Sequence, residues 1–585
     1  MHKRIVLFVS IYALVNPELA SQTERFRGNT TPTWEQVIAS YRELDQSYEE
    51  ASLVEIGMSD AGKPLHLFII NKTKVFKLFD ISASGRPILL VNNAIHPGEP
   101  CGVDACLQLA RNILKKEGGE ASKELDIGNT IVCIVPFYNI GGGLNRGCCS
   151  RANQNGPEEY GFRGSARNLD LNRDFIKCDS ENSESFTKMF RALQPHVFVD
   201  THTSNGADYQ YTMTMISTQA DKAGPVIGPY MQQEMDPWLY QRMKEKGWEM
   251  SPYVESVRET PDQGIYSFLE TPRYSTGYAT LFNTIGYVSE THMLKPYEDR
   301  VESTYQFLIS LLEYMKVNGA ALIELQRKAM EYTKHQELFP IRWKLDTTHC
   351  TLIDFKGYEA VYEPSEVTGS DRLRYDRTRP FEKKIRCYGK YTASKEVLKP
   401  DYYLVPYAWR EVRERLVWNG VEYHQIKSDT IFRNAEVYYI SDVNAPGSPY
   451  EGHYLHSKVE VNRLPLDVQA HSGDWLIPVN QACNRYIVET LEPEAHDAFF
   501  VWNFFDSVLQ QKEWFSDYVF EDEAADMLRE NPELNEEFER QKKVDASFAS
   551  NPKAQLYFLY QRSGNFEITF NRYPIYRIFS REKVE

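Results

Sequence analysis

A histidine and a glutamate, His96 and Glu99, stand three positions apart in the segment ILLVNNAIHPGEPCGVDACLQLARNIL, residues 88 to 114. An apolar run precedes them, and helical spacing of apolar residues begins after Gly102. Three interpretations are open. The pair can belong to a turn, because Pro-Gly ends strands and Glu99 can cap the next helix. It can act as a general acid/base pair. It can also supply two ligands of a zinc site, because His and Glu at this spacing can converge on one ion.

A second histidine, His202, ends the run HVFVDTHT at residues 196 to 203, 103 residues beyond Glu99. Alone it would be an ordinary histidine at a strand end. Together with the first pair it gives two neighbouring ligands and one distant ligand, which leaves a coordination position for water. That layout is typical of a catalytic zinc site rather than of a closed structural one.

The segment EEYGFRGSARNLDLNRDFIK, residues 158 to 177, carries Arg163, Asp170, Asn172 and Arg173 close together. A zinc-bound histidine usually donates a hydrogen bond from its other ring N–H to a carboxylate, and Asp170 can accept such a bond. Guanidinium groups beside a zinc site can hold a substrate carboxylate or polarise a carbonyl. The alternative is a surface loop of mixed charge.

A further carboxylate, Glu290, ends the run TIGYVSETH at residues 284 to 292. It can take the proton of a zinc-bound water and later deliver it to a leaving amine. A glutamate buried at a strand end is uncommon without a partner, which favours a function.

Short apolar strands alternate with helices between residues 85 and 320. The sequence predicts strands in 86–93, 129–139, 196–203 and 284–292, and helices over 102–116, 183–194 and 297–317. Runs rich in Ile, Val and Leu that alternate with helices indicate an α/β domain with a largely buried sheet. The candidate ligands and Glu290 lie at strand ends, where functional residues of such sheets gather.

The rest of the chain shows a different sequence pattern. Residues 340–490 show short alternating, Tyr-rich runs and are predicted to form a β-rich accessory domain. Residues 491–585 are predicted to form a mainly helical segment. Residues 1–22 have the basic start, short apolar core and small-residue end of a signal peptide, which predicts a periplasmic or secreted protein.

Composition excludes several classes of protein. The 585 residues are 42% hydrophobic and 25% charged, as in globular proteins, and the net charge is −16. Nucleic acid and anionic membranes are therefore not expected as partners, because both require clustered Lys and Arg, and no run is long and apolar enough for a membrane span. Nine cysteines are few, and their pairing cannot be derived from the sequence.

The order His-x-x-Glu, Arg, Asp-x-Asn-Arg, His, Glu resembles that of the zinc carboxypeptidase superfamily, over roughly residues 34 to 320. The HPGE form is most similar to the cytosolic carboxypeptidases and their bacterial relatives. The resemblance implies a mixed central sheet with helices on both faces. It also implies one zinc ion per chain and a peptide substrate with a free C-terminal carboxylate. The implied zinc ligands are His96, Glu99 and His202.

The resemblance also implies roles for the remaining residues. Asp170 would orient His96, Asn172 and Arg173 would hold the terminal carboxylate, Arg163 would stabilise the oxyanion, and Glu290 would be the general base. Family members also place a mobile tyrosine near the end of the substrate, and spacing favours Tyr266 or Tyr274 over Tyr278.

The selector of the substrate side chain stays open between Arg273, Ser275 and Thr276. Two other functions also stay open. The same site can remove an acyl or amide group from a small amino-acid or cell-wall peptide substrate, or the chain can be a binding protein on an inactive peptidase scaffold. Retention of both Glu290 and Arg163 argues against the binding protein. The oligomeric state cannot be predicted.

Overall fold

The computed structural model describes residue 26 and residues 28–115 and 125–579. The predicted signal peptide, residues 1–22, lies outside them. The chain divides into two compact units, one of Met1–Ala329 with Leu345–Thr392 and one of Met330–Lys344 with Ala393–Glu585. The candidate site residues all belong to the first unit.

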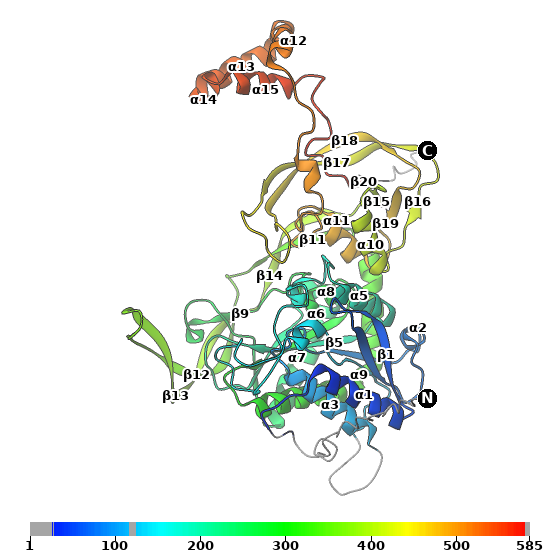
Figure 1. The fold of residues 1–585 in the computed structure, drawn as a ribbon, viewed down its shortest axis with the longest axis vertical. Helices are drawn as coiled ribbons and strands as arrows, with labels where there is room; N and C mark the ends of the chain where they lie inside the picture. The colour runs from blue at the N-terminus through cyan, green and yellow to red at the C-terminus, as the bar shows by residue number, and fades with distance from the viewer. Residues whose placement is uncertain (1–25, 27, 116–124, 580–585) are drawn as a thin grey trace, which may run out of the picture. The chain divides into compact units, whose positions relative to one another are not determined.

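The first unit is built on one eight-stranded mixed sheet (Figure 1). In their order across the sheet the strands are β1 (Ala51–Met58), β2 (Pro64–Ile70), β4 (Ile131–Val135), β3 (Ile88–Asn92), β5 (Val197–Ser204), β10 (Ile285–His292), β6 (Met213–Ser217) and β7 (Met250–Pro252). The four central strands β4, β3, β5 and β10 are parallel, and β2 and β6 join them antiparallel. All residues of β3, β4 and β5 are buried, which explains their near-continuous apolar sequences.

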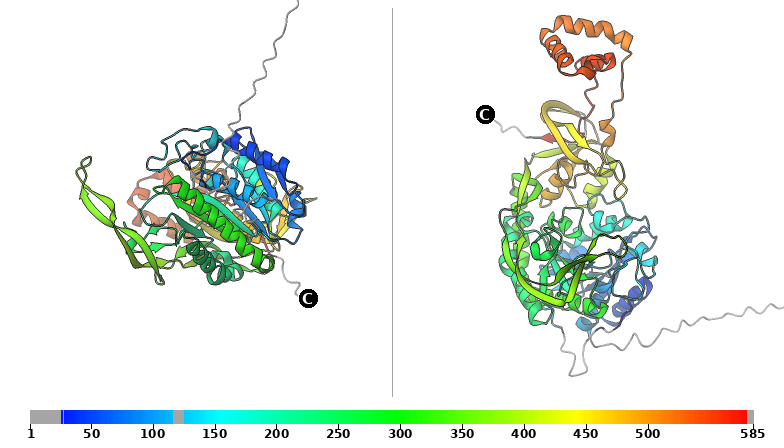
Figure 2. Two further views of the ribbon diagram at one scale, coloured as in Figure 1. Left: turned by 90° about the horizontal axis from the view of Figure 1, so that it is seen from below. Right: turned by 90° about the vertical axis from the view of Figure 1, so that its left-hand side faces the viewer.

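Helices cover both faces of this sheet, as expected from the resemblance. On one face α1 (Trp34–Ser47), α3 (Cys101–Leu114) and α9 (Tyr297–His335) share a single apolar core with Leu89 and Val91 of β3. Helix α9 is the long green helix in the left view of Figure 2. On the other face α5 (Glu181–Leu193) and α8 (Ser275–Thr280) pack through aromatic rings, such as Phe190 against Phe198 of β5 and against Tyr278. The predicted α/β fold class is confirmed.

A long hairpin of β12 (Thr351–Pro364) and β13 (Asp371–Tyr388) belongs to the first unit, although the sequence placed it in the accessory domain. The hairpin continues a small sheet with β9 (Ile265–Tyr266) and β8 (Glu255–Ser256). Gln210 also donates to the carbonyls of Gly357 and Phe381, both at 2.9 Å. Residue 340 is therefore not a single boundary, since residues 330–344 belong to the second unit and residues 345–392 to the first; alternation within a strand does not show which sheet the strand joins.

The second unit contains a six-stranded sheet and a set of helices. Across the sheet the strands are β16 (His424–Gln425), β19 (Trp475–Pro478), β15 (Tyr402–Val405), β20 (Tyr576–Ile578), β17 (Thr430–Asn444) and β18 (Ser457–Ala470). A two-stranded ribbon of β11 (Leu338–Leu345) and β14 (Tyr391–Leu398) comes before this sheet in the chain. Helix α10 (Arg410–Trp418) lies between β15 and β16 in the chain, and α11 (Asn484–Leu491) follows β19.

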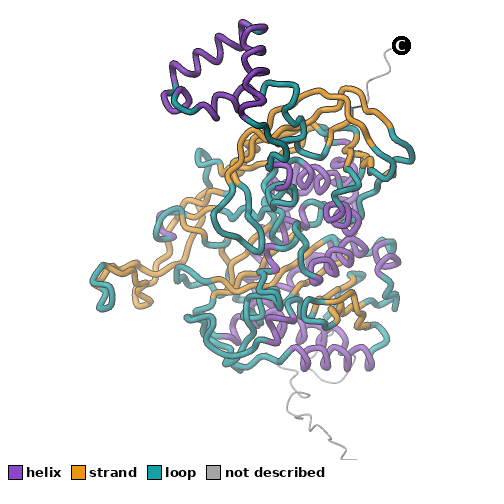
Figure 3. The backbone as a smooth tube through the Cα atoms, turned by 45° about the horizontal axis from the view of Figure 1, so that its top comes forward, coloured by secondary structure: helices purple, strands orange, loops and turns teal. Residues whose placement is uncertain are grey.

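The C-terminal helices of this unit form a separate small cluster (Figure 3). They are α12 (Asp517–Glu530), α13 (Pro532–Val544), α14 (Ala546–Ala549) and α15 (Pro552–Tyr560). Their shared core is largely aromatic, with Phe520, Phe538 and Phe548 buried. The buried aromatic residues of this segment therefore serve packing, whereas Tyr518 of α12 is exposed. Within the part of the chain that the structure describes, no helix has the length and apolar character needed to cross a membrane.

Candidate metal centre and substrate cavity

His96, Glu99 and His202 converge at the C-terminal ends of two neighbouring parallel strands. His96 and Glu99 lie in the turn between β3 and α3, and His202 lies in β5, which pairs with β3. One ligand atom from each lies within 4.8 Å of the others, and all three side chains are buried. Two imidazoles and a carboxylate are a ligand set that zinc accepts.

Each histidine is oriented by a carboxylate through Nε2. The Nε2 of His96 lies 2.9 Å from Oδ1 of Asp170, and the Nε2 of His202 lies 3.0 Å from Oδ2 of Asp200. The Nδ1 atoms therefore face Glu99, at 3.2 Å for His96 and 3.0 Å for His202. Nδ1 of His96 is buried and has no hydrogen-bond partner. A buried, unpartnered imidazole nitrogen between two further ligand atoms fits a bound metal ion.

The role of Asp200 was missed from the sequence, although a signal was present. Asp200 stands two residues before His202 on the same strand, and residues at this spacing project from the same face of a sheet. Asp200 has no exposed surface, and its Oδ1 accepts a hydrogen bond from the Asn92 amide at 3.1 Å. Each oxygen of the Asp200 carboxylate is therefore held by a hydrogen bond, one with His202 and one with Asn92.

Arg151 is a second residue that the sequence did not indicate. Its guanidinium donates to Oε1 of Glu99 at 2.7 Å and to the Thr203 carbonyl at 2.8 Å. Burial alone would raise the pKa of Glu99, but Arg151 and the two histidines together lower this pKa well below its usual range. Glu99 is therefore held ionised, as a metal ligand must be.

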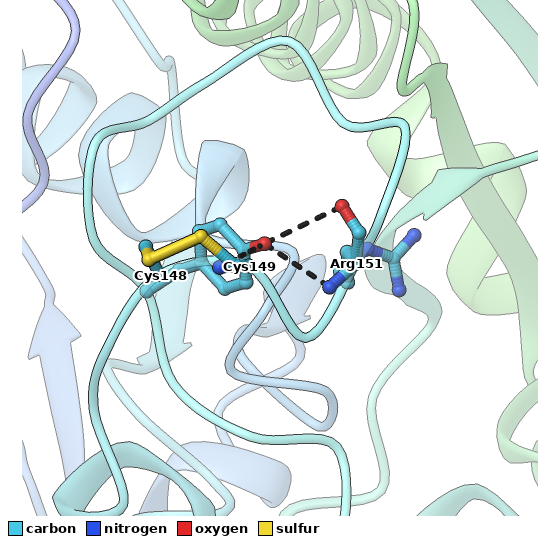
Figure 4. Close-up of a disulfide and its surroundings, with 4 residues drawn as sticks. Cys148, Cys149 and Arg151 are labelled. Carbon is cyan, nitrogen blue, oxygen red and sulfur yellow. Dashed lines mark hydrogen bonds between the residues drawn. A yellow bond between two sulfur atoms is a disulfide. The ribbon is translucent and has the colours of Figure 1, made fainter.

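Arg151 comes from a loop that carries a disulfide between the adjacent Cys148 and Cys149 (Figure 4). The Tyr160 hydroxyl accepts hydrogen bonds from the backbone N–H groups of Cys149 and Arg151, at 3.0 and 3.1 Å. The remaining seven cysteines are free thiols, and all except Cys350 are buried.

Glu290 stands beside His202 because of the register of β10 on β5, in which the two residues are directly paired. Burial is the main reason that the pKa of Glu290 is raised to about 7, and the Glu99 and Asp200 carboxylates add to it, while His202 and Arg151 act in the opposite direction. A carboxyl group with a pKa near neutrality can both accept and release a proton under ordinary conditions.

Asn172 and Arg173 lie in a short 3-10 helix, Leu171–Arg173, that follows Asp170 directly. The Asp170 carboxylate accepts the Asn172 N–H at 2.9 Å, so one side chain fixes both this turn and His96. The Asn172 amide oxygen accepts the Ser275 N–H at 3.1 Å. Arg163 donates through Nε to Asp170 at 3.0 Å, and its Nη1 lies 3.6 Å from Glu99.

A cavity of about 330 Å³ lies beside the candidate metal ligands. The predicted site residues among its lining include His96, Glu99, His202, Glu290, Arg163, Asn172 and Arg173. The lining also includes residues that the sequence did not indicate: Arg151, Ile216, Tyr253, Phe268 and Glu270. The cavity therefore brings the candidate metal ligands and three guanidinium groups together in one space.

The structure separates the two tyrosines that spacing could not. Tyr274 lines the cavity, and its ring lies 4.5 Å from the Arg173 guanidinium. Tyr266 is not a lining residue; it stands in β9, paired with Tyr388 of the hairpin. Arg273, Ser275 and Thr276 are not among the lining residues either, since α8 buries both hydroxyl side chains.

Comparison with known proteins agrees with the motifs. Residues 37–209 match the family model described as zinc carboxypeptidase. The resemblance to zinc carboxypeptidases is confirmed. The matched segment contains all three ligand residues, and Glu290 lies beyond it. No curated protein sequence matches the chain.

Solved structures similar to this chain include two metallocarboxypeptidases and a carboxypeptidase A. That of Burkholderia cenocepacia is 13% identical, with 48% of this chain and 69% of that chain covered and a TM-score of 0.35. That of Pseudomonas aeruginosa is 14% identical, with 49% and 68% covered and a TM-score of 0.36. The carboxypeptidase A of Helicoverpa armigera is 14% identical, with 52% and 76% covered and a TM-score of 0.36.

Proposed function

We propose that the protein is a zinc-dependent metallocarboxypeptidase that removes the C-terminal residue of peptides. The observation that carries this proposal is the shared cavity, which Asn172 and Arg173 line together with the His-Glu-His cluster. An arginine fork takes both oxygens of a carboxylate, and an amide can hold one of them. A peptide anchored there by its terminus presents its last peptide bond to the metal ligands.

His96, Glu99 and His202 would hold the zinc ion. When bound, zinc acts as a Lewis acid that polarises a carbonyl and lowers the pKa of a coordinated water. Glu290 takes a proton from the attacking water as its oxygen bonds to the scissile carbonyl carbon. Arg163 offsets the negative charge that develops on the carbonyl oxygen.

Glu290 then returns the proton to the amide nitrogen as the C–N bond breaks, so that an amine leaves and a new carboxylic acid group forms; the proton of that acid passes to the amine, which gives a carboxylate and an ammonium group. Arg173 and Asn172 keep the released residue in place by its carboxylate until it departs. Both protons of the water therefore end on the leaving amine, one by way of Glu290 and one from the new carboxylic acid, and Glu290 starts and ends each turnover ionised.

The first experiment compares peptides that end in a free acid with matched amides. Amidation removes the substrate charge that Arg173 would hold, so the charge-assisted pair between the guanidinium and the terminal carboxylate cannot form. We expect kcat/KM to fall by about two orders of magnitude or more. Arg173→Ala should lower activity on the acid and narrow the difference between acid and amide. Arg167→Ala is the matched control, because Arg167 is exposed and does not line the cavity. Equal cleavage of acid and amide by the wild type would instead favour an endopeptidase or a deacylase.

The second experiment tests the proton carrier. Glu290→Gln is nearly isosteric and cannot accept a proton, so we expect zinc content and fold to persist while kcat falls by about 10² to 10⁴. Zinc content is measured by elemental analysis and fold by circular dichroism. A variant that turns over at the wild-type rate would place the base elsewhere.

A further inference from the structure

The cavity contains one acidic side chain that the proposed chemistry does not use. Glu270 lies between β9 and α8, lines the cavity and is 6% exposed. Its Oε2 atom is buried and has no hydrogen-bond partner. The nearby Lys222 ammonium donates instead to the backbone carbonyl of Glu270, at 2.8 Å. A buried carboxyl oxygen without a partner is costly, and such a group calls for an explanation.

Apolar and aromatic side chains connect this region of the cavity to Asn172 and Arg173. Tyr274, which lies against Arg173, is in contact with Phe268 at 5.3 Å between ring centroids, and Phe268 is in contact with Tyr253 at 6.3 Å. All three rings line the cavity, as does Ile216. The walls therefore suit the methylene stem of a long side chain, and Glu270 adds a carboxyl group among them.

We infer that Glu270 selects substrates whose C-terminal residue carries a cationic side chain, as lysine and arginine do. The inference rests on the proposed carboxypeptidase function. When Arg173 and Asn172 hold the terminal carboxylate and the scissile carbonyl lies at the metal ligands, the last side chain enters the remaining space, which Glu270 lines. An ammonium or guanidinium group there pairs with the unpartnered oxygen.

Other side chains fit this space less well. An acidic side chain would bring a second negative charge beside Glu270 and the other carboxylates. A neutral apolar side chain would leave the buried carboxyl group without a partner. The electrostatics agree: burial is the main reason that the pKa of Glu270 is raised to about 8, Asp200 and Glu290 add to it, and His202 and Lys222 lower it only in part. The cations already beside Glu270 therefore do not offset the cost of ionising its buried carboxyl group.

The test uses the zinc-loaded full chain and a set of N-blocked dipeptides that differ only in the last residue: lysine, norleucine or glutamate. Norleucine has the stem of lysine without its charge. We expect kcat/KM for lysine to exceed that for norleucine by about 10²-fold or more, because sites built to pair a polar group reject analogues that lack it. Glutamate should be the poorest substrate.

Two substitutions then assign the preference to Glu270. Glu270→Gln should reduce the ratio of lysine to norleucine by about tenfold or more, and Glu270→Asp should keep the preference for the cation, since charge-assisted pairs are roughly twice as strong as neutral ones. The ratio compares two substrates on the same protein, so a partial loss of folded enzyme does not change it. Glu234→Gln is the control, because Glu234 is exposed and is not a lining residue; its ratio should equal that of the wild type.

The outcomes separate this inference from the proposed function. Efficient cleavage of free-acid peptides with equal rates for lysine and norleucine overturns the inference and leaves the carboxypeptidase proposal standing. A Glu270→Gln ratio equal to that of the wild type also overturns it. If no free-acid peptide is cleaved, the proposed function fails, and calorimetric titration with free L-lysine and L-norleucine decides the inference: tighter binding of lysine that is lost in Glu270→Gln supports it, and equal affinities overturn it.

Discussion

Replacement of Asp200 by asparagine tests whether the carboxylates behind the histidines set the metal affinity. Asp200 is fully buried and bonds on one side to His202, at 3.0 Å, and on the other to the Asn92 amide, at 3.1 Å. An asparagine has the same shape but only one acceptor oxygen. It can accept from Asn92 and turn its own N–H₂ toward His202, or accept from His202 and leave the Asn92 donor facing another donor.

Both arrangements weaken metal binding. In the first, the asparagine donates to Nε2 of His202, which forces the ring proton onto Nδ1, the atom that faces Glu99 and the metal position. In the second, a buried donor loses its partner and the imidazole loses the negative charge that raises its basicity. Loss of such a partner typically weakens metal binding by about 10- to 100-fold. This corresponds to about 1.4 to 2.7 kcal/mol, because each decade of affinity is worth about 1.4 kcal/mol.

The measurement is the zinc dissociation constant, from competition with a chromophoric chelator at fixed pH. Asp104→Asn is the matched control: Asp104 is also a buried aspartate, its carboxylate accepts hydrogen bonds from Thr31 and Tyr297, and it contacts no metal ligand. We expect weaker zinc binding in Asp200→Asn and wild-type binding in Asp104→Asn. Unchanged affinity in Asp200→Asn, or an equal loss in both variants, would refute the reasoning.

Two further predictions concern stability. In Gly102→Ala the new Cβ would stand 2.0 Å from Oγ1 of Thr201 and 2.5 Å from Oδ1 of Asn93, so we expect urea unfolding to show a loss of about 1–3 kcal/mol. Gly147→Ala, with no atom within 4 Å of the new Cβ, should show little change. Burial lowers the pKa of His196 to about 4 from its ordinary 6.5, so the unfolded chain takes up a proton that the folded chain refuses. Stability should fall as the pH drops from about 6.5 to 4, by about 3 kcal/mol from this group, and His196→Asn should flatten that slope in urea unfolding at several pH values; an unchanged slope would contradict the assignment.

The sequence was sufficient to predict the fold class of the first unit because its strands are short, apolar and separated by helices. The run ending in His96 and the run ending in His202 became neighbouring parallel strands, β3 and β5. Because these two strands are parallel neighbours, His96 and His202 lie at the same edge of the sheet. Glu290 joined them through the register of β10 on β5, which pairs it with His202. Apolar patterning predicts a strand well, and the carboxyl ends of parallel strands share one edge of the sheet.

Residues that act from loops were not predictable in the same way. Arg151 reaches Glu99 from a loop whose path depends on Tyr160 and on the disulfide of Cys148 and Cys149. No periodicity connects that loop to the strand ends. Glu270 was missed for a different reason: a glutamate in a polar sequence segment is normally exposed, and only the tertiary structure shows that this one is 6% exposed and unpartnered at Oε2.

The charges around the cavity form a consistent pattern. Three guanidinium groups line it, and the acidic groups that line it or stand behind the histidines are Glu99, Asp170, Asp200, Glu270 and Glu290. With every one of these groups ionised, the three cations leave two negative charges over, which is the charge that one zinc ion balances. Of the five acids, Glu270 and Glu290 have raised pKa values, near 8 and 7. A substrate with a terminal carboxylate and a cationic side chain adds one charge of each sign, so it can bind without disturbing this balance. A substrate with a neutral side chain would bring only the charge of its terminal carboxylate and would leave the site with a net negative charge.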